Sequence, residues 1–109
     1  MRRGEVWTLR DDRFAAKARP VVVVQSDEVT FNWTVVCLFT TFDSSDVPTR
    51  VLIPANERNG LRMDSYVMTE KLAAVEPSEF GVRLGLLTDQ QMDQVAKAVA
   101  QVLGFSVGA

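Results

Sequence analysis

The stretch Arg19-Pro20-Val21-Val22-Val23-Val24 decides the fold class of this sequence. Pro20 is followed by valines only, up to Val24, and a near-continuous run of β-branched residues is typical of a strand that is buried on both faces. The segments on either side of this run must therefore supply neighbouring strands and apolar cover for a buried strand over residues 20–24.

Further strands are predicted on both sides of the valine run. Each is a short stretch rich in β-branched, aromatic or alternating apolar residues, bounded by Gly, Pro, Asn, Asp or Ser. The predicted strands are residues 5–9, 33–41, 48–53, 64–73 and 82–86, with turns at 43–46 and 59–60 and a short helical turn at 76–79. Pro48 is placed at the start of its strand, where no ladder donor is needed.

The C-terminal segment predicts a helix. Thr88 and Gln91 form a capping box, and Gly104 is a typical stop. Apolar residues recur at helical spacing at Met92, Val95, Ala96, Val99, Val102 and Leu103. We expect residues 1–109 to form one mainly β domain, a small, strongly bent sheet or barrel with the C-terminal helix lying across it.

Composition excludes several classes of function. The 109 residues contain one cysteine, Cys37, and no histidine, which excludes an internal disulfide, the usual zinc, haem and non-haem iron sites, and Ser-His-Asp or Cys-His catalysis. There is no membrane-spanning run and no signal peptide, so we expect a cytosolic protein. A domain this small often gains stability by oligomerising, which makes a homodimer plausible.

The net charge of −2 does not by itself suggest a nucleic-acid binder, but basic residues are dense near the N-terminus. They are Arg2, Arg3, Arg10, Arg13, Lys17 and Arg19. Several lie in the polar segment 10–18, which predicts a surface connection of the kind that often carries function; a solvated surface is the alternative. Trp7 and Trp33 are predicted to pack in the core or at a barrel rim rather than to stack on bases.

The sequence resembles the MazF/PemK/Kid toxins over nearly its whole length. The matching pieces occur in the family order and at compatible spacing. They are Arg3-Gly4-Glu5-Val6-Trp7, the segment from Arg19 to Asp27, Phe39-Thr40-Thr41, Pro48-Thr49, the segment from Gly60 to Ser65, and Leu84-Gly85-Leu86-Leu87-Thr88 with the terminal helix.

This resemblance implies an SH3-like barrel of the CcdB/PemK type that forms a homodimer. It also implies a metal-independent endoribonuclease, without cofactors, that cuts single-stranded RNA at short sequences to give 2′,3′-cyclic phosphate and 5′-OH ends. The implied partner is an antitoxin whose acidic, flexible tail blocks the RNA groove; its degradation frees the toxin to arrest translation.

Arg19 matches the catalytic arginine of the family. Metal-free cleavage is possible when the 2′-OH of the RNA attacks the neighbouring phosphate, and a guanidinium suits the charge that develops there. The alternative is an arginine that caps the strand entry or pairs with Asp27. Thr40 matches a site threonine whose hydroxyl would hold a phosphate oxygen, with Thr41 as a second choice; ordinary β-propensity is the alternative for both.

Arg62-Met63-Asp64 reproduces an Arg-x-Asp arrangement that supplies acid and base in the Kid/PemK branch. On an extended chain both charged side chains would point to the same face, which places an acceptor beside a donor. Asp64 could accept the 2′-OH proton, or it could be a structural ion-pair partner of Arg62 or Arg19.

The residues predicted to bind RNA are Arg13, Lys17, Thr41 and Lys71, and no metal ligands are predicted. The segment 10–18 departs from the family because it is shorter, lacks glycines and has no histidine. Two other functions remain open at this point: a CcdB-like toxin that binds gyrase, and a non-catalytic SH3-like binding module.

Overall fold

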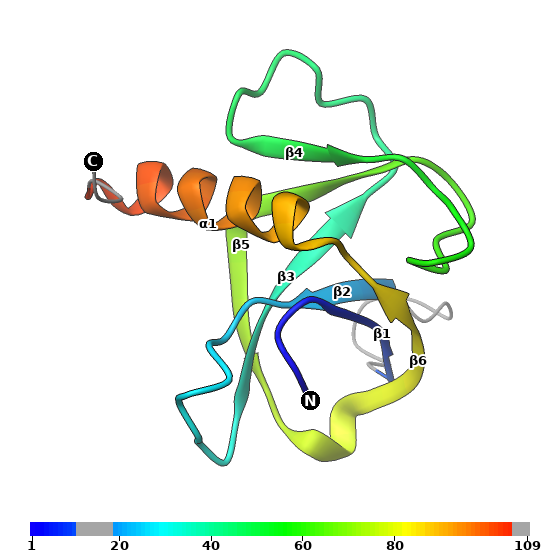
Figure 1. Cartoon of the computed structure of the whole chain (residues 1–109), viewed down its shortest axis with the longest axis vertical. Coiled ribbons are helices and arrows are strands. Elements are labelled where there is room, and N and C mark those ends of the chain that lie inside the picture. The colour runs from blue at the N-terminus through cyan, green and yellow to red at the C-terminus, as the bar shows by residue number, and fades with distance from the viewer. Residues whose placement is uncertain (11–18, 106–109) are drawn as a thin grey trace.

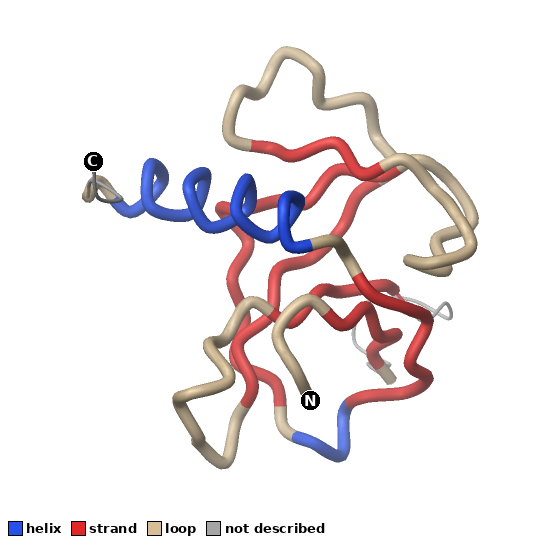
Figure 2. Tube along the Cα trace, in the orientation of Figure 1, coloured by secondary structure: helices blue, strands red, loops and turns tan. Residues whose placement is uncertain are grey.

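The computed structural model describes residues 1–10 and 19–105 (Figure 1). Strands are the main secondary structure, and one long helix follows them (Figure 2). In chain order the elements are β1 (Glu5–Leu9), β2 (Arg19–Val23), β3 (Thr34–Thr40), β4 (Arg50–Ile53), β5 (Ser65–Val75), the 3-10 turn η2 (Pro77–Glu79), β6 (Phe80–Leu86) and α1 (Asp89–Leu103). The predicted fold class, mainly β with a C-terminal helix, is confirmed.

The strands form one antiparallel sheet in the order β4-β5-β3-β2-β1-β6. The sheet curls, so that β6 at one edge comes close to the connection between β4 and β5 at the other (Figure 1). The backbone N–H of Leu86 donates to the carbonyl of Arg58 (3.0 Å) and joins the two. This contact partly closes the barrel.

The valine run is buried on both faces, as predicted. Val22 belongs to the core between the sheet and α1, whereas Val21 and Val23 belong to a second core on the opposite face. The second core also contains Val36, Val75 and Phe80, with Trp7 packed against it. Cys37 lies in the first core, where burial raises the pKa of its thiol to about 12.

The C-terminal helix begins and ends where the sequence predicts. Thr88 and Gln91 form the capping box, and Gly104 adopts a left-handed conformation with φ 82°. The predicted apolar stripe is only partly correct, because Ala96, Val102 and Leu103 are exposed. Figure 1 gives the reason for Val102 and Leu103, since the last turns of α1 extend past the edge of the sheet. Ala96 lies in the middle of α1, where Ala98 and Ala100 are buried instead.

Two other expectations need correction. Pro48 lies in a turn before β4, which begins only at Arg50. Trp7 packs edge-on against Phe80, with ring centroids 5.7 Å apart, but Trp33 lies just before β3 and is 47% exposed, so of the two predicted positions, core or barrel rim, the core is excluded for Trp33. Within the described residues, no helix is long and apolar enough to cross a bilayer.

Candidate functional site

The strand register brings residues from five strands into one row across the sheet. Leu9 of β1 pairs with Arg19 of β2, and Tyr66 of β5 pairs with both Thr40 of β3 and Leu52 of β4. The β2–β3 register pairs Val21 with Leu38, and continuing it by two residues places Arg19 opposite Thr40. We call Leu9, Arg19, Thr40, Tyr66 and Leu52 the cross-strand row.

The cross-strand row lies on the sheet face that points away from α1. Side chains two residues apart on a strand share a face, and directly paired residues do so as well. Arg19 therefore shares the face of Val21, and Thr40 that of Leu38; both belong to or pack on the second core. Arg19 is exposed, Leu52 is 47% exposed, and Thr40 and Tyr66 are half-buried. The row is open to a ligand.

Arg19 has its guanidinium donors available. Its side chain has no hydrogen-bond or ion-pair partner within residues 1–10 and 19–105. The alternative of a pair with Asp27 is wrong, because Asp27 lies beyond the other end of β2 and accepts from the backbone N–H of Arg3 (2.8 Å). An exposed guanidinium without a partner in the described part of the chain is suited to bind an anion.

Thr40 ends β3 and anchors the turn that follows. Its Oγ1 accepts a hydrogen bond from the backbone N–H of Phe42 (3.1 Å), so its own hydroxyl proton is left to donate. Thr41 follows it and is exposed. Thr40 can therefore hold the turn and donate to a ligand oxygen at the same time.

Tyr66 and Asp43 link this turn to the sheet. The Tyr66 hydroxyl donates to Asp43 Oδ1 (3.2 Å), and the backbone N–H of Ser45 donates to the same oxygen (3.0 Å). The hydrogen bonds from Ser45, and then the one from Tyr66, lower the pKa of Asp43. Partial burial and the nearby Asp43 raise the pKa of Tyr66. Tyr66 thus stays protonated at neutral pH and acts as a donor.

Arg62 and Asp64 are not arranged as the sequence predicted. Arg62 lies in a bend before β5, which begins at Ser65, so the argument from an extended chain does not hold for it. Asp64 Oδ1 accepts from the backbone N–H of Ala55 (2.8 Å). An ion pair of Asp64 with Arg62 or Arg19 does not occur in the described part of the chain. Asp64 nevertheless directly precedes β5, at the end of the strand where Tyr66 of the cross-strand row lies.

Of the other predicted RNA-binding residues, Lys71 lies apart from the row. Lys71 is in a bulge of β5, where the register with β3 shifts between Cys37 and Leu38, and it lies five positions beyond Tyr66 along the strand. Arg13 and Lys17 lie outside the described residues. The structure thus brings together Arg19, Thr40 and the start of β5, but not Lys71.

An ion pair next to the row was not anticipated. Arg50 Nη2 lies 2.6 Å from Glu70 Oε2, and Arg50 Nη1 donates to Ser44 Oγ (3.0 Å). Arg50 lowers the pKa of Glu70. Arg50 shares the face of Leu52 because it lies two residues before it. The signal in the sequence was the spacing of Arg50 and Leu52, which lie two residues apart in β4 and so share a face. The prediction of a strand over residues 48–53 did not consider which side chains share a face.

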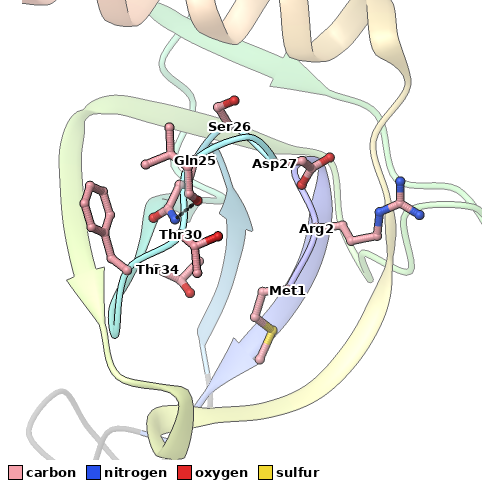
Figure 3. A pocket seen from close by; sticks show the side chains of 9 residues that line it. Met1, Arg2, Gln25, Ser26, Asp27, Thr30 and Thr34 are labelled. Atoms are coloured by element: carbon pink, nitrogen blue, oxygen red, sulfur yellow. Dashed lines mark hydrogen bonds between the residues drawn. The ribbon is translucent and has the colours of Figure 1, made fainter.

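Two pockets lie away from the row. One, of about 360 Å³, is formed between the N-terminus and the segment that joins β2 to β3, and Figure 3 shows Met1, Arg2, Gln25 and Asp27 around it. The other, of about 570 Å³, is lined by apolar side chains that include Phe31 and Trp33. Neither contains a residue of the cross-strand row, which lies at the exposed end of the sheet face that carries the second core.

Comparison with known proteins gives consistent matches over almost the whole chain. The family model for the PemK-like, MazF-like toxin of type II toxin-antitoxin systems matches residues 2–103. A protein of Mycolicibacterium smegmatis named "Probable endoribonuclease MazF" is 32% identical over an alignment of 109 positions, gaps included, which spans 97% of this chain and 99% of that protein.

Solved structures share the fold. The Mycobacterium tuberculosis toxin MazF-mt6 matches with a TM-score of 0.79 at 22% identity, covering 94% of this chain and 99% of its own. A mycobacterial endoribonuclease in complex with its cognate antitoxin matches with a TM-score of 0.81 at 24% identity, covering 99% of both chains. With a family model that spans residues 2–103 and a relative that is 32% identical, this chain belongs to the PemK-like, MazF-like family of toxins of type II toxin-antitoxin systems.

Proposed function

We propose that this chain is a toxin that cleaves single-stranded RNA, mRNA included, at specific short sequences and thereby stops translation and growth. The observation that carries the proposal is the exposed Arg19, without a partner among the described residues, at the end of β2 where the β2–β3 register, continued by two residues, leads to Thr40. Family membership and the relative named as a probable endoribonuclease support it.

The proposed reaction is an internal transesterification. The 2′ oxygen of one nucleotide forms a bond to the adjacent phosphorus, the bond from phosphorus to the 5′ oxygen breaks, and the products are a 2′,3′-cyclic phosphate and a 5′-OH. The substrate supplies the nucleophile, so the protein has to position the phosphate, accept a proton and stabilise the developing charge.

We assign the catalytic roles to four residues. The planar guanidinium of Arg19 donates hydrogen bonds to the non-bridging phosphate oxygens, and the Thr40 hydroxyl donates a hydrogen bond to one of them. Asp64 accepts the 2′-OH proton on the carboxylate oxygen that does not bind Ala55. Arg62 donates a hydrogen bond to the departing 5′ oxygen, which takes its proton from water.

The partners are proposed on the same basis. Arg13, Lys17, Thr41 and Lys71 would contact the RNA beyond the scissile phosphate, and the 109-residue domain would act in the cytoplasm as a homodimer without a cofactor. A cognate antitoxin would cover the RNA face with an acidic, flexible tail. A related endoribonuclease whose structure includes its cognate antitoxin supports this assignment.

The test is to incubate the purified protein with a varied pool of single-stranded RNA in excess EDTA and to map the new ends. Cleavage should persist, because the 2′-OH of the substrate replaces the metal-bound water that many nucleases need. We expect cuts at one short sequence, each leaving a 5′-OH.

Two outcomes would contradict the proposal. Strict dependence on added Mg²⁺ would overturn the metal-free mechanism. The absence of any cleavage would overturn the nuclease assignment, and gyrase inhibition would then separate a CcdB-like toxin from a binding module without activity.

A further inference from the structure

Phe42 is the most exposed of the large apolar side chains that the structure describes. It is 76% exposed, whereas Phe39, three residues earlier in β3, is 4% exposed in the core beneath α1. Exposure of an aromatic side chain to water is unfavourable in free energy, and binding of a flat apolar partner would remove that apolar surface from water.

The backbone of Phe42 is fixed relative to the candidate site. Its N–H donates to Thr40 Oγ1 (3.1 Å), and its carbonyl accepts from Ser44 Oγ (3.0 Å). Ser44 is 2% exposed and is itself bound by Arg50 Nη1 (3.0 Å). The ring is therefore presented by a turn that is ordered before any ligand binds.

The distance from Phe42 to Thr40 suits a neighbouring nucleotide. Two residues along an extended chain span at most about 7 Å between Cα atoms. A phosphate held by Arg19 and Thr40 thus has its flanking nucleotide within reach of the Phe42 ring.

Charge decides which part of the nucleotide faces the turn. Asp43 and Asp46 follow Phe42, and both are exposed. The lowered pKa of Asp43 keeps its carboxylate ionised at neutral pH. These carboxylates repel phosphate but can accept hydrogen bonds from base N–H groups. The phosphate should lie toward Arg19, and the base should lie over Phe42.

We infer that Phe42 is a stacking platform for the base next to the scissile phosphate of a single-stranded RNA. The inference rests on the proposed function and adds a positioning residue to it. Stacking on aromatic side chains is a common way to hold unpaired bases, and it tolerates different bases because each has a π face. A protein partner covering Phe42 is the competing explanation, which the test below separates.

The test uses an RNA that the wild-type protein cleaves, made uncleavable by a 2′-deoxy substitution at the cut nucleotide and labelled with 2-aminopurine on either side of it. Phe42→Leu should weaken binding about tenfold and abolish the fluorescence quenching caused by stacking. Phe42→Trp should retain both. Phe31→Leu is the matched control, because Phe31 is 64% exposed but lies in the β2–β3 connection, at the other end of β2 from Arg19; it should behave as the wild type.

The outcomes distinguish failure of this inference from failure of the proposed function. If the wild type cleaves no RNA, the proposed function fails and the stacking role falls with it. If the wild type cleaves and Phe42→Leu binds and quenches like the wild type, only the stacking role is wrong. Loss of dimer or antitoxin binding with unchanged RNA binding would instead assign Phe42 to a protein interface.

Discussion

Replacing Arg19 with alanine should lower the single-turnover rate of RNA cleavage by about 10² to 10³-fold, the usual cost of removing one donor that stabilises developing charge. The fold should survive, because the Arg19 side chain makes no hydrogen bond or ion pair with another described residue that the substitution would remove. The measurement is the rate with saturating enzyme on a mapped RNA, together with the thermal midpoint of each protein.

Arg19→Lys and Arg2→Ala serve as controls. Arg19→Lys keeps the charge but loses the planar fork, so it should recover only part of the rate. Arg2 is also an exposed arginine, but it lies at the N-terminus beside the pocket of Figure 3 and away from the row. Arg2→Ala should cleave at the wild-type rate. Wild-type cleavage by Arg19→Ala would refute the assignment of Arg19.

Replacing Gly85 with alanine should cost about 3 kcal/mol of unfolding free energy and lower the thermal midpoint by roughly 15 °C. Gly85 packs directly against the backbone of Arg58 and Asn59, where a Cβ atom has no room. The connection between β4 and β5, which contains Arg58 and Asn59, cannot easily move. The buried Asn59 side chain binds the backbone of Pro54, Asn56 and Leu61 and holds it in place.

The matched control for Gly85→Ala is Gly104→Ala. Gly104 has a φ of 82° and nothing near its missing Cβ, so alanine there should cost only about 1 kcal/mol through backbone strain. Gly85→Ala should also slow RNA cleavage, because the connection that it pushes against carries Arg62 and leads to Asp64. Thermal unfolding followed by circular dichroism measures both variants, and equal midpoints would show that the β6 contact does not close the barrel tightly.

The fold was predictable because its main signals are local. The valine run, the capping box at Thr88 and the stop at Gly104 each depend on residues next to one another in the chain. The burial of the last turn of α1 was mispredicted because apolar periodicity says nothing of where the sheet ends. The sequence did not decide between the core and the barrel rim for Trp33, because burial depends on whether another element covers that side of the sheet.

The site was predictable as a set of residues but not as an arrangement. Arg19, Thr40 and Asp64 were found through a family resemblance, and the β2–β3 register, continued by two residues, leads from Arg19 to Thr40. The bond from Ala55 to Asp64, the Arg50–Glu70 pair and the bond between Tyr66 and Asp43 join segments 9, 20 and 23 residues apart. Contacts at such separations depend on strand pairing, which composition and spacing do not specify.

The most direct measurement of the central claim replaces a single 2′-OH. An RNA that the protein cuts at one mapped position is compared with the same RNA carrying a 2′-deoxy group only at the nucleotide whose 2′ oxygen would attack. If Arg19 and Thr40 serve a transesterification, the deoxy RNA should bind to the protein but remain intact. Cleavage of the deoxy RNA at the same position would contradict the account, because the nucleophile would then have to come from elsewhere.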